Sequence, residues 1–183
     1  MRVESVFTEG VFLIKPSIYK DERGFFCEFF NRDTFEKETG IKVNFVQDNL
    51  SQSSKNVLRG FHFQLKPYEQ AKLVSVLKGA VLDVIVDLRK DSKTFGQYFS
   101  VELNEENKYQ LFIPKGFAHA YLALQDDTLF FYKTDHFYHK KAEAGIIYND
   151  PDIGMFWPID NDKIIISEKD KNLRSFSEIS KNL

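Results

Sequence analysis

The feature that most constrains the fold is a succession of short, strand-like segments that runs through most of the chain. Segments rich in β-branched and aromatic residues recur at spacings of roughly ten residues, separated by turn-forming sequences. The segments are GVFLIKP (10–16), GFFCEFF (24–30), VNFVQDNLSQS (43–53), NVLRGFHFQ (56–64), QAKLVSVLKG (70–79), AVLDVIVDLR (80–89), YFSVELN (98–104), YQLFIPKG (109–116), AHAYLALQ (118–125) and TLFFYKTDHFY (128–138). Because helices do not alternate with these strands, the pattern favours an antiparallel sandwich or barrel over βαβ units.

One short helix and an irregular C-terminal part complete the expected all-β fold. The segment NRDTFEKETG (31–40) predicts a helix, with Asp33 as its N-cap and Gly40 at its end. From NDPDIGMFWP (149–158) onward the sequence is typical of loops with short helical turns. The chain has 183 residues, of which 43% are hydrophobic, which suits one substantial core. We therefore expect a single domain over residues 1–183.

The charge balance argues against several classes of partner. A formal net charge of −2 at pH 7 provides no basic field for nucleic acid or an anionic membrane surface. No apolar run approaches the roughly 20 residues that span a bilayer, and the first residues do not contain the apolar core of a secretory signal. The single cysteine, Cys27, excludes an intrachain disulfide and suits a reducing compartment. We expect a cytoplasmic protein that binds neither nucleic acid nor membrane.

Three polar residues fall where successive strands should be buried. Within LRGFHFQ (58–64), strict alternation puts Arg59 on the face of the two phenylalanines and His62 on the opposite face. A β-bulge at Gly60 is one way in which both side chains could reach the same site. Lys72 lies in an otherwise apolar pattern on the next strand, and Asp83 shares a face with valine and isoleucine on the strand after that. Charged and titratable groups are costly in a core unless something pairs with them. Their presence on consecutive strands predicts a functional site.

Three common kinds of catalytic site lack their residues here. A metal-binding cupin barrel often begins its ligand set with His-x-His, whereas His62 is followed by Phe-Gln. His136 and His139 are three residues apart, at a strand end that we expect to be exposed. The sequence contains neither a Gly-x-Ser-x-Gly elbow nor a glycine-rich phosphate loop. We therefore expect no metal and no hydrolase triad, although Arg23 and Arg59 could hold a phosphate through bidentate contacts.

Proton transfer beside a carbonyl group is the chemistry that the remaining polar residues suit. His62 can act as the base, and the Lys72 ammonium can stabilise an enolate. A phenol such as Tyr132 or Tyr138 can return a proton from the other face. A hydrogen-bonded core histidine and tyrosines that only pack would explain the same residues, and the pattern alone leaves both interpretations open.

Five runs, in the same chain order, resemble the dTDP-4-dehydrorhamnose 3,5-epimerase family. They are FVQDNLSQSSKNVLRGFHFQ (45–64), QAKLVSVLKGAVLDVIVDLR (70–89), FIPKGFAHAYLAL (112–124), YKTDHFYHKKAEAGIIYNDPDIGMFWP (132–158) and SEKD (167–170). The resemblance covers nearly the whole chain. It implies a cupin-type jelly-roll β-barrel that works as a homodimer without a metal or other cofactor. It also implies a dTDP-linked 4-keto-6-deoxy sugar as substrate, on the route to dTDP-L-rhamnose.

The resemblance assigns roles to the residues that the strand pattern had singled out. It implies that His62 is the general base and that Asp170 orients and charges it. Lys72, with Asp83 beside it, would hold the C4 oxygen as the enolate forms, and Tyr132 would donate the proton on the opposite face. A C4 ketone acidifies the hydrogens on both C3 and C5, so the substrate itself supplies the electron sink for both inversions.

The remaining positions implied by the resemblance surround the sugar, the diphosphate and the base. In this chain they are Gln47, Asn49, Arg59, His119, Tyr138, Glu143 and Lys169. Tyr138 matches the aromatic residue that stacks on thymine. Arg23, Phe26 and Glu28 match a strand that reaches into the neighbouring subunit's site, so dimerisation would be part of building each active site.

Several relatives of this family carry out different reactions on similar barrels. Some invert only C3 or only C5, others isomerise a 3,4-keto sugar, and some use another nucleotide. A barrel that binds a sugar nucleotide without catalysis is a further alternative. The presence of both His62 and Tyr132 favours epimerisation, whereas the number of inverted centres depends on how the substrate is placed.

Overall fold

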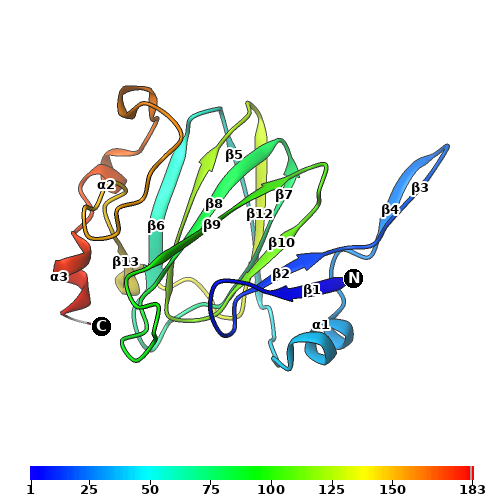
Figure 1. Cartoon of the computed structure of the whole chain (residues 1–183), viewed down its shortest axis with the longest axis horizontal. Coiled ribbons are helices and arrows are strands. Elements are labelled where there is room, and N and C mark those ends of the chain that lie inside the picture. Colours follow the sequence, from blue (N-terminus) through cyan, green and yellow to red (C-terminus); the bar gives the residue numbers. More distant parts are fainter. Residues whose placement is uncertain (182) are drawn as a thin grey trace.

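Two antiparallel β-sheets packed face to face form the body of the chain in this computed structural model, which describes residues 1–181 and 183 (Figure 1). The six-stranded sheet contains, in spatial order, β1 (Arg2–Ser5), β2 (Phe12–Lys15), β10 (Gln110–Ile113), β7 (Lys72–Lys78), β12 (Thr128–Thr134) and β5 (Gln47–Ser53). The five-stranded sheet contains β13 (Glu143–Gly145), β6 (Leu58–Gln64), β11 (Phe117–Ala123), β8 (Ala80–Asp87) and β9 (Tyr98–Asn104). The prediction of an all-β fold is therefore confirmed.

Short helices lie outside the two sheets. They are α1 (Arg32–Thr39), η1 (Lys140–Ala142), η2 (Asn161–Lys163), α2 (Glu168–Lys171) and α3 (Phe176–Ser180). In Figure 1, α1 lies below the N-terminal strands, whereas α2 and α3 lie at the outer side of β6. Within the described residues, none of these helices is long and apolar enough to cross a membrane.

The two sheets bury their facing surfaces through residues that alternate along the strands. Val74 and Val76 of β7 pack against Val81 and Ile85 of β8 in one continuous apolar cluster between the sheets. Each of these side chains is at most 2% exposed. The alternation of apolar residues in the sequence therefore arises from packing between the two sheets, because every second residue of a strand points to the same face.

The outer faces of both sheets are also covered. Ala118 and Ala120 of β11 pack outward against the irregular C-terminal part, in a cluster that includes Trp157. On the other sheet, Phe112 of β10 packs edge-on against Phe35 of α1, with 5.0 Å between the ring centroids. Burial on both faces explains why strands such as β11 are almost wholly apolar, since neither face meets water.

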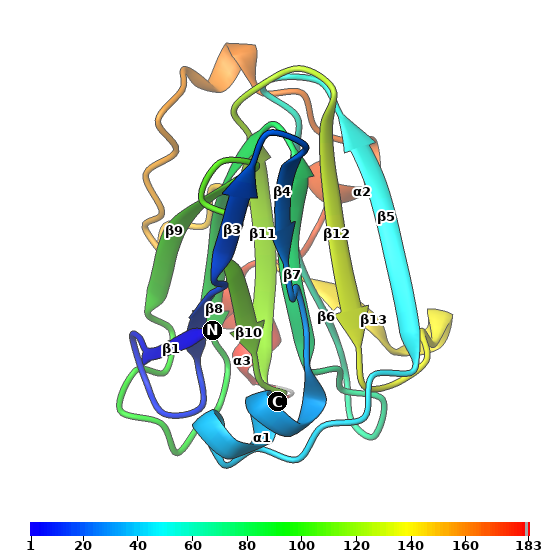
Figure 2. The same ribbon diagram turned by 90° about the vertical axis from the view of Figure 1, so that its right-hand side faces the viewer.

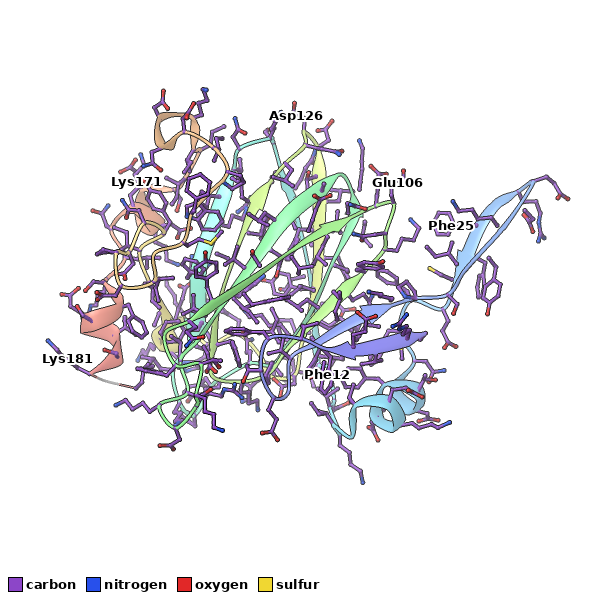
Figure 3. The ribbon with its side chains drawn as sticks, viewed as in Figure 1. Phe12, Phe25, Glu106, Asp126, Lys171 and Lys181 are labelled. Carbon is purple, nitrogen blue, oxygen red and sulfur yellow. The ribbon has the colours of Figure 1, made fainter. Side chains whose placement is uncertain are left out.

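One hairpin projects away from the sandwich. Strands β3 (Ile18–Asp21) and β4 (Gly24–Cys27) pair only with each other, and they extend beyond the body of the molecule (Figure 1). Figure 3 shows Phe25 on this hairpin, clear of the two sheets, and Figure 2 shows the hairpin in front of them. Tyr19, Phe25 and Phe26 are 66%, 57% and 69% exposed. Three large rings in water on a single hairpin are unusual for a monomeric surface.

Several boundaries differ from those expected. The N-cap of α1 is Asn31, whose Oδ1 accepts a hydrogen bond from the backbone N–H of Thr34 at 3.1 Å, so the prediction of Asp33 as the cap is wrong. Asp33 instead lies in the first turn, where its charge favours the helix N-terminus. Gly40 ends the helix in the left-handed conformation, as predicted. The strand expected over 24–30 stops at Cys27.

Strand β6 contains the irregularity that decides where its polar side chains point. His62 pairs with His119 and Arg59 pairs with Tyr121, so two residues of β6, Gly60 and Phe61, lie opposite the single residue Ala120 of β11. This β-bulge includes Gly60, where an added Cβ would lie 2.5 Å from the carbonyl oxygen of His119. The bulge turns Arg59 to the inner face that His62 occupies. The prediction from strict alternation, which put Arg59 on the opposite face, is wrong for this reason.

Candidate functional site

A cavity of about 490 Å³ opens between the two sheets. Strands β5, β7 and β12 contribute side chains from one sheet, and β6, β11 and β13 from the other. The lining residues are Asp48, Asn49, Leu50, Ser51, Arg59, His62, Phe63, Gln64, Gln70, Lys72, His119, Tyr121, Phe130, Tyr132, Tyr138 and Glu143. A concave site with converging titratable groups is a candidate for binding and catalysis.

His62 and Asp170 form a hydrogen-bonded pair at this cavity. His62 Nε2 lies 2.8 Å from Asp170 Oδ1, and Asp170 Oδ2 accepts a hydrogen bond from the backbone N–H of Gly60 at 3.2 Å. Burial raises the pKa of Asp170, but His62, the backbone N–H of Gly60 and the charge of Lys169 together outweigh it, so the pKa is lowered and the carboxyl is ionised at neutral pH. An ionised carboxylate only accepts hydrogen bonds. The neutral imidazole therefore carries its proton on Nε2, which leaves the lone pair on Nδ1.

Short local structure delivers Asp170 to this position. Ser167 caps α2 by accepting a hydrogen bond from the backbone N–H of Asp170 at 3.1 Å. The helix is only one turn long, and it lies against β6. The Asp170 side chain is 6% exposed, whereas that of His62 is 33% exposed. The carboxylate is thus shielded behind the imidazole, and the imidazole faces the cavity.

A second histidine–aspartate pair lies deeper in the sandwich. His119 Nε2 lies 2.8 Å from Asp83 Oδ2, and both side chains are buried. Burial lowers the pKa of His119 against the opposing effect of Asp83, which keeps the ring neutral at pH 7. Burial also lowers the pKa of Lys72 from 10.5 to about 8, and the negative charge of Asp83 limits that fall. These three residues form an electrostatic cluster in which Lys72 and Asp83 carry charges of opposite sign.

Lys72, His62 and Asp83 come from three consecutive strands, but those strands are not neighbours in one sheet. Strands β6 and β8 flank β11 in the five-stranded sheet, whereas β7 belongs to the opposing sheet. The three side chains therefore meet across the sandwich rather than along one sheet. The sequence predicted that these side chains form one site on consecutive strands. It did not predict that the strands belong to both sheets.

Tyr132 lies on β12, opposite Asn49 of β5 in the strand register. Burial and the neighbouring Tyr121 raise the pKa of Tyr132, whereas the positive charge of Arg59 lowers it; the net result is a raised pKa. The phenol therefore keeps its proton at neutral pH. A half-buried, protonated phenol that lines the same cavity as His62 is suited to donate a proton.

An ion-pair network borders the cavity. Lys169 Nζ lies 2.6 Å from Glu143 Oε1, and Tyr138 donates its hydroxyl proton to Glu143 Oε2 at 3.0 Å. The pKa of Glu143 is lowered because these two partners outweigh the effect of burial. Gln47 accepts a hydrogen bond from the backbone N–H of Tyr138 at 3.0 Å, which holds the segment after β12 against β5. Tyr138 is 48% exposed, so its ring is available to a ligand.

The structure brings together most of the residues expected from the sequence. Those that line the cavity are Asn49, Arg59, His62, Lys72, His119, Tyr132, Tyr138 and Glu143. Those that contact a lining residue through a hydrogen bond or ion pair are Gln47, Asp83, Lys169 and Asp170. Arg23, Phe26 and Glu28 lie on or beside the projecting hairpin, outside the cavity of their own chain. There Arg23 is paired with Asp21 and 83% exposed.

Sequence reasoning missed three groups on the inner faces. Ser51 of β5, Tyr121 of β11 and Phe130 of β12 all line the cavity. A signal for Ser51 was present in the alternation of QDNLSQS (47–53), which puts Asn49 and Ser51 on the same face. Tyr121 lies in a strand that is buried on both faces, where a single hydroxyl gives no periodic signal.

The other two histidines have an aromatic partner. The rings of Tyr68 and His139 stack with 3.8 Å between their centroids, and the ring of His136 meets Tyr68 edge-on at 5.7 Å. Both histidines are half-buried, whereas Phe137, Tyr138 and the two lysines that follow His139 are exposed, as expected for the strand end. Across the part of the chain that the structure describes, no group of three or more His, Cys, Asp or Glu side chains is arranged to hold a metal ion.

Comparison with known proteins shows similarity to one family over nearly the whole chain. A family profile described as dTDP-4-dehydrorhamnose 3,5-epimerase matches residues 6–178. The dTDP-4-dehydrorhamnose 3,5-epimerase of Shigella flexneri is 51% identical over 176 residues, which cover 96% of this chain and 96% of that protein. The crystal structure of dTDP-4-dehydrorhamnose 3,5-epimerase from Elizabethkingia anophelis NUHP1 is similar with a TM-score of 0.93 and 44% identity, covering 97% of each chain.

A second solved structure contains a ligand. The dTDP-6-deoxy-D-glucose-3,5-epimerase of Legionella pneumophila Philadelphia 1, in complex with dTDP-4-keto-L-rhamnose, is 44% identical to this chain with a TM-score of 0.93. The match covers 97% of this chain and 94% of that one. The similarity therefore extends over the whole sandwich.

Proposed function

Because the chain belongs to the dTDP-4-dehydrorhamnose 3,5-epimerase family, we propose how its cavity performs the epimerisation. The protein is an isomerase with the cupin-type fold of that family, and it acts in dTDP-rhamnose biosynthesis. Its reaction converts dTDP-4-dehydro-6-deoxy-D-glucose into dTDP-4-dehydro-L-rhamnose, by inversion at C3 and C5. What remains is to assign each chemical step to a side chain.

The first step of the proposal is removal of a proton from carbon. The hydrogens on C3 and C5 are acidic because each lies next to the C4 carbonyl, whose oxygen accepts the charge as an enolate forms. His62 takes the proton on Nδ1, since Asp170 holds the other ring nitrogen in its protonated form. The resulting imidazolium is stabilised by the Asp170 carboxylate, which lies 2.8 Å away.

The second step is stabilisation of the enolate oxygen. Lys72 supplies a positive charge from a half-buried position on the cavity wall, where the charge acts more strongly than it would in bulk water. Its pKa of about 8 leaves the ammonium mostly charged at pH 7. Asp83 and His119 fix the local field from behind, because they pair with each other in the core.

The third step is return of a proton to the carbon from the opposite face. Tyr132 donates its phenolic proton, which inverts the centre, and the C4 carbonyl forms again. The protons therefore leave through one residue and arrive through another, which is what inversion requires. The electrons stay within the substrate, so the sequence of steps contains no net oxidation or reduction.

The nucleotide end of the substrate fits the border of the cavity. We assign the diphosphate to Arg59, whose planar guanidinium suits phosphate oxygens. We assign the exposed ring of Tyr138 to stacking on the thymine base. Glu143 accepts a hydrogen bond from the Tyr138 hydroxyl and is itself paired with Lys169, which holds the ring in place. Gln47, Asn49 and the cavity-lining His119 complete the contacts to the sugar and diphosphate.

The projecting hairpin supports a homodimer in this proposal. Arg23, Phe26 and Glu28 cannot reach the cavity of their own chain, and the exposed rings of the hairpin need a cover. We propose that the hairpin of each subunit reaches the cavity of a second copy and closes its open side. The single cysteine is consistent with a cytoplasmic location for this enzyme.

One observation carries the proposal, namely that a single cavity contains a histidine with its own buried carboxylate, a lysine and a protonated phenol. The test is incubation with dTDP-4-dehydro-6-deoxy-D-glucose in D₂O, followed by NMR of the sugar. We expect deuterium at both C3 and C5. Deuterium at one carbon would show a mono-epimerase, and deuterium at neither would show an isomerase of another kind or a binding protein.

A further inference from the structure

The side chain of Tyr121 reaches across the cavity from one sheet to the other. Tyr121 lies on β11 in the five-stranded sheet, and its hydroxyl lies 3.0 Å from Ser51 Oγ and 3.2 Å from Ser53 Oγ. Both serines lie on β5, the edge strand of the six-stranded sheet. Tyr121 and Ser53 are at most 5% exposed. Two buried hydroxyls and the half-buried hydroxyl of Ser51, bonded in this way, restrict the arrangement of the surrounding side chains.

The network continues from Ser53 to Arg59. The Arg59 Nε–H donates to Ser53 Oγ at 3.2 Å, and Nη2 donates to the carbonyl oxygen of Gln52 at 3.1 Å. Two nitrogens of the guanidinium are thereby held by β5. Because the group is planar and rigid, two contacts fix its plane and the direction in which its remaining N–H groups point.

Arg59 is also the positive charge that acts on Tyr132. Both residues line the same cavity, and the charge of Arg59 lowers the pKa of Tyr132, whereas burial and Tyr121 raise it. Packing keeps this part of the cavity rigid. The Tyr121 ring stacks on Phe130 with 4.2 Å between centroids, and the Phe130 ring lies 6.1 Å from that of Tyr132.

We propose that Tyr121, Ser51 and Ser53 are positioning residues that hold the Arg59 guanidinium beside Tyr132, so that Arg59 stabilises the phenolate left when Tyr132 donates its proton. In this step the O–H bond of Tyr132 breaks and a C–H bond forms at the enolate carbon. The electron pair of the enolate makes that bond, the C4 carbonyl returns, and the negative charge passes to the Tyr132 oxygen. The inference rests on the proposed role of Tyr132 as the proton donor.

Because Tyr132 is half-buried, its phenolate needs a positive charge held close to it. A phenolate in a half-buried site is unfavourable unless a positive charge or hydrogen bonds compensate for the lost hydration. A freely rotating arginine would instead find water or a phosphate. Anchoring it on β5 keeps its charge near the phenol at both inversions, while its remaining N–H groups stay available to the diphosphate.

The test compares two outcomes of the same incubation in D₂O. Deuterium in recovered starting sugar reports removal and return of a proton on the His62 face, whereas inverted product reports donation by Tyr132. Tyr121→Phe removes the hydroxyl and keeps the ring stacked on Phe130. We expect formation of inverted product to fall about five- to tenfold, as for loss of one hydrogen bond to a charged network. Deuterium in the recovered sugar should not fall by that factor.

The Ser53→Ala variant removes the same link from the other side and leaves Tyr121 intact. It should also lower the ratio of inversion to exchange, as Tyr121→Phe does. It keeps the test decisive if Tyr121→Phe does not fold. Tyr109→Phe is the matched control, because Tyr109 packs against the same apolar cluster without lining the cavity. It should leave the ratio unchanged.

Equal losses of inversion and exchange would overturn the proposal, because they would indicate a general structural role. A change confined to the dissociation constant of dTDP, with the ratio unchanged, would also overturn it, since Arg59 would then only bind phosphate. The proposed function fails separately, if the unmodified enzyme incorporates no deuterium at C3 or C5.

Discussion

The two histidine–aspartate pairs of the sandwich have the same geometry and different surroundings. In each pair Nε2 of the imidazole lies 2.8 Å from a carboxylate oxygen. The His62 side chain is 33% exposed and lies at the cavity with Asp170 behind it, whereas the His119 and Asp83 side chains are 9% and 0% exposed. Lys72 places a positive charge near the buried pair, which contributes to the lowered pKa of His119.

This difference assigns proton transfer to the accessible pair, His62 and Asp170, and an electrostatic role to the buried pair, His119 and Asp83. A base must exchange protons with its substrate and with water, so it has to be accessible, as His62 is. The buried pair cannot exchange readily, and burial lowers the pKa of His119 so that it stays neutral. Its effect is electrostatic, because Asp83 keeps a negative charge near the Lys72 ammonium. The predictions below test this division.

Replacing His62 should have the largest effect. We expect His62→Ala to lower epimerisation and deuterium exchange at both carbons by at least about a thousandfold, as for loss of a general base. Binding of dTDP, measured by calorimetry, should be retained, since the nucleotide contacts lie at the border of the cavity. His136→Ala is a suitable control, because His136 lies outside the cavity. Normal exchange in His62→Ala would rule out this assignment of the base.

Replacing the carboxylate of the accessible pair should have the next largest effect. Asp170→Asn removes the charge and introduces an amide that can donate to Nε2, which would move the imidazole proton to Nδ1. The lone pair would then be on the wrong nitrogen, and we expect kcat to fall about a hundredfold. NMR of the imidazole nitrogens can establish the tautomer directly. An unchanged tautomer with an unchanged kcat would show that Asp170 does not orient the base.

The sequence predicted the charged residues that β7 and β8 carry in the core. On β7 and β8, alternation alone placed Lys72 and Asp83 among buried side chains, because β8 follows the pleat throughout and β7 does so from Lys72 to Val76. The same reasoning failed for Arg59. The bulge at Gly60 depends on the close approach of β11, which is distant in the sequence, so local alternation contains no sign of it.

Asp170 and His119 could not be derived from local pattern. Asp170 lies in a four-residue helix, 108 positions from His62, and nothing in the periodicity of either segment links them. His119 lies in FAHAYLA (117–123), a strand buried on both faces, where the pattern is simply apolar. Only the resemblance to a known family supplied these residues. The N-cap of α1 shows the same limit at short range, because Asn31 and Asp33 are both suitable caps.

The smallest predicted effect concerns the pH dependence that the buried pair imposes through Lys72. The charged ammonium is the form that stabilises the enolate, and its pKa in the folded protein is about 8. It is therefore present below this pH and is lost as the pH rises through it. We expect kcat/KM of the unmodified enzyme, which reports the free enzyme, to fall above about pH 8.

Asp83→Asn should shift this alkaline limb, because Asp83 raises the pKa of Lys72. Without that negative charge the ammonium loses its proton more easily, so the limb should move to lower pH by no more than about one unit. The rate below the limb should change only severalfold, since His62 and Asp170 are untouched. Asp160→Asn, at an exposed ion pair, is the matched control. A limb that stays in place, or one that moves equally in both variants, would show that the buried pair does not set the charge of Lys72. The two histidine–aspartate pairs would then differ in exposure alone.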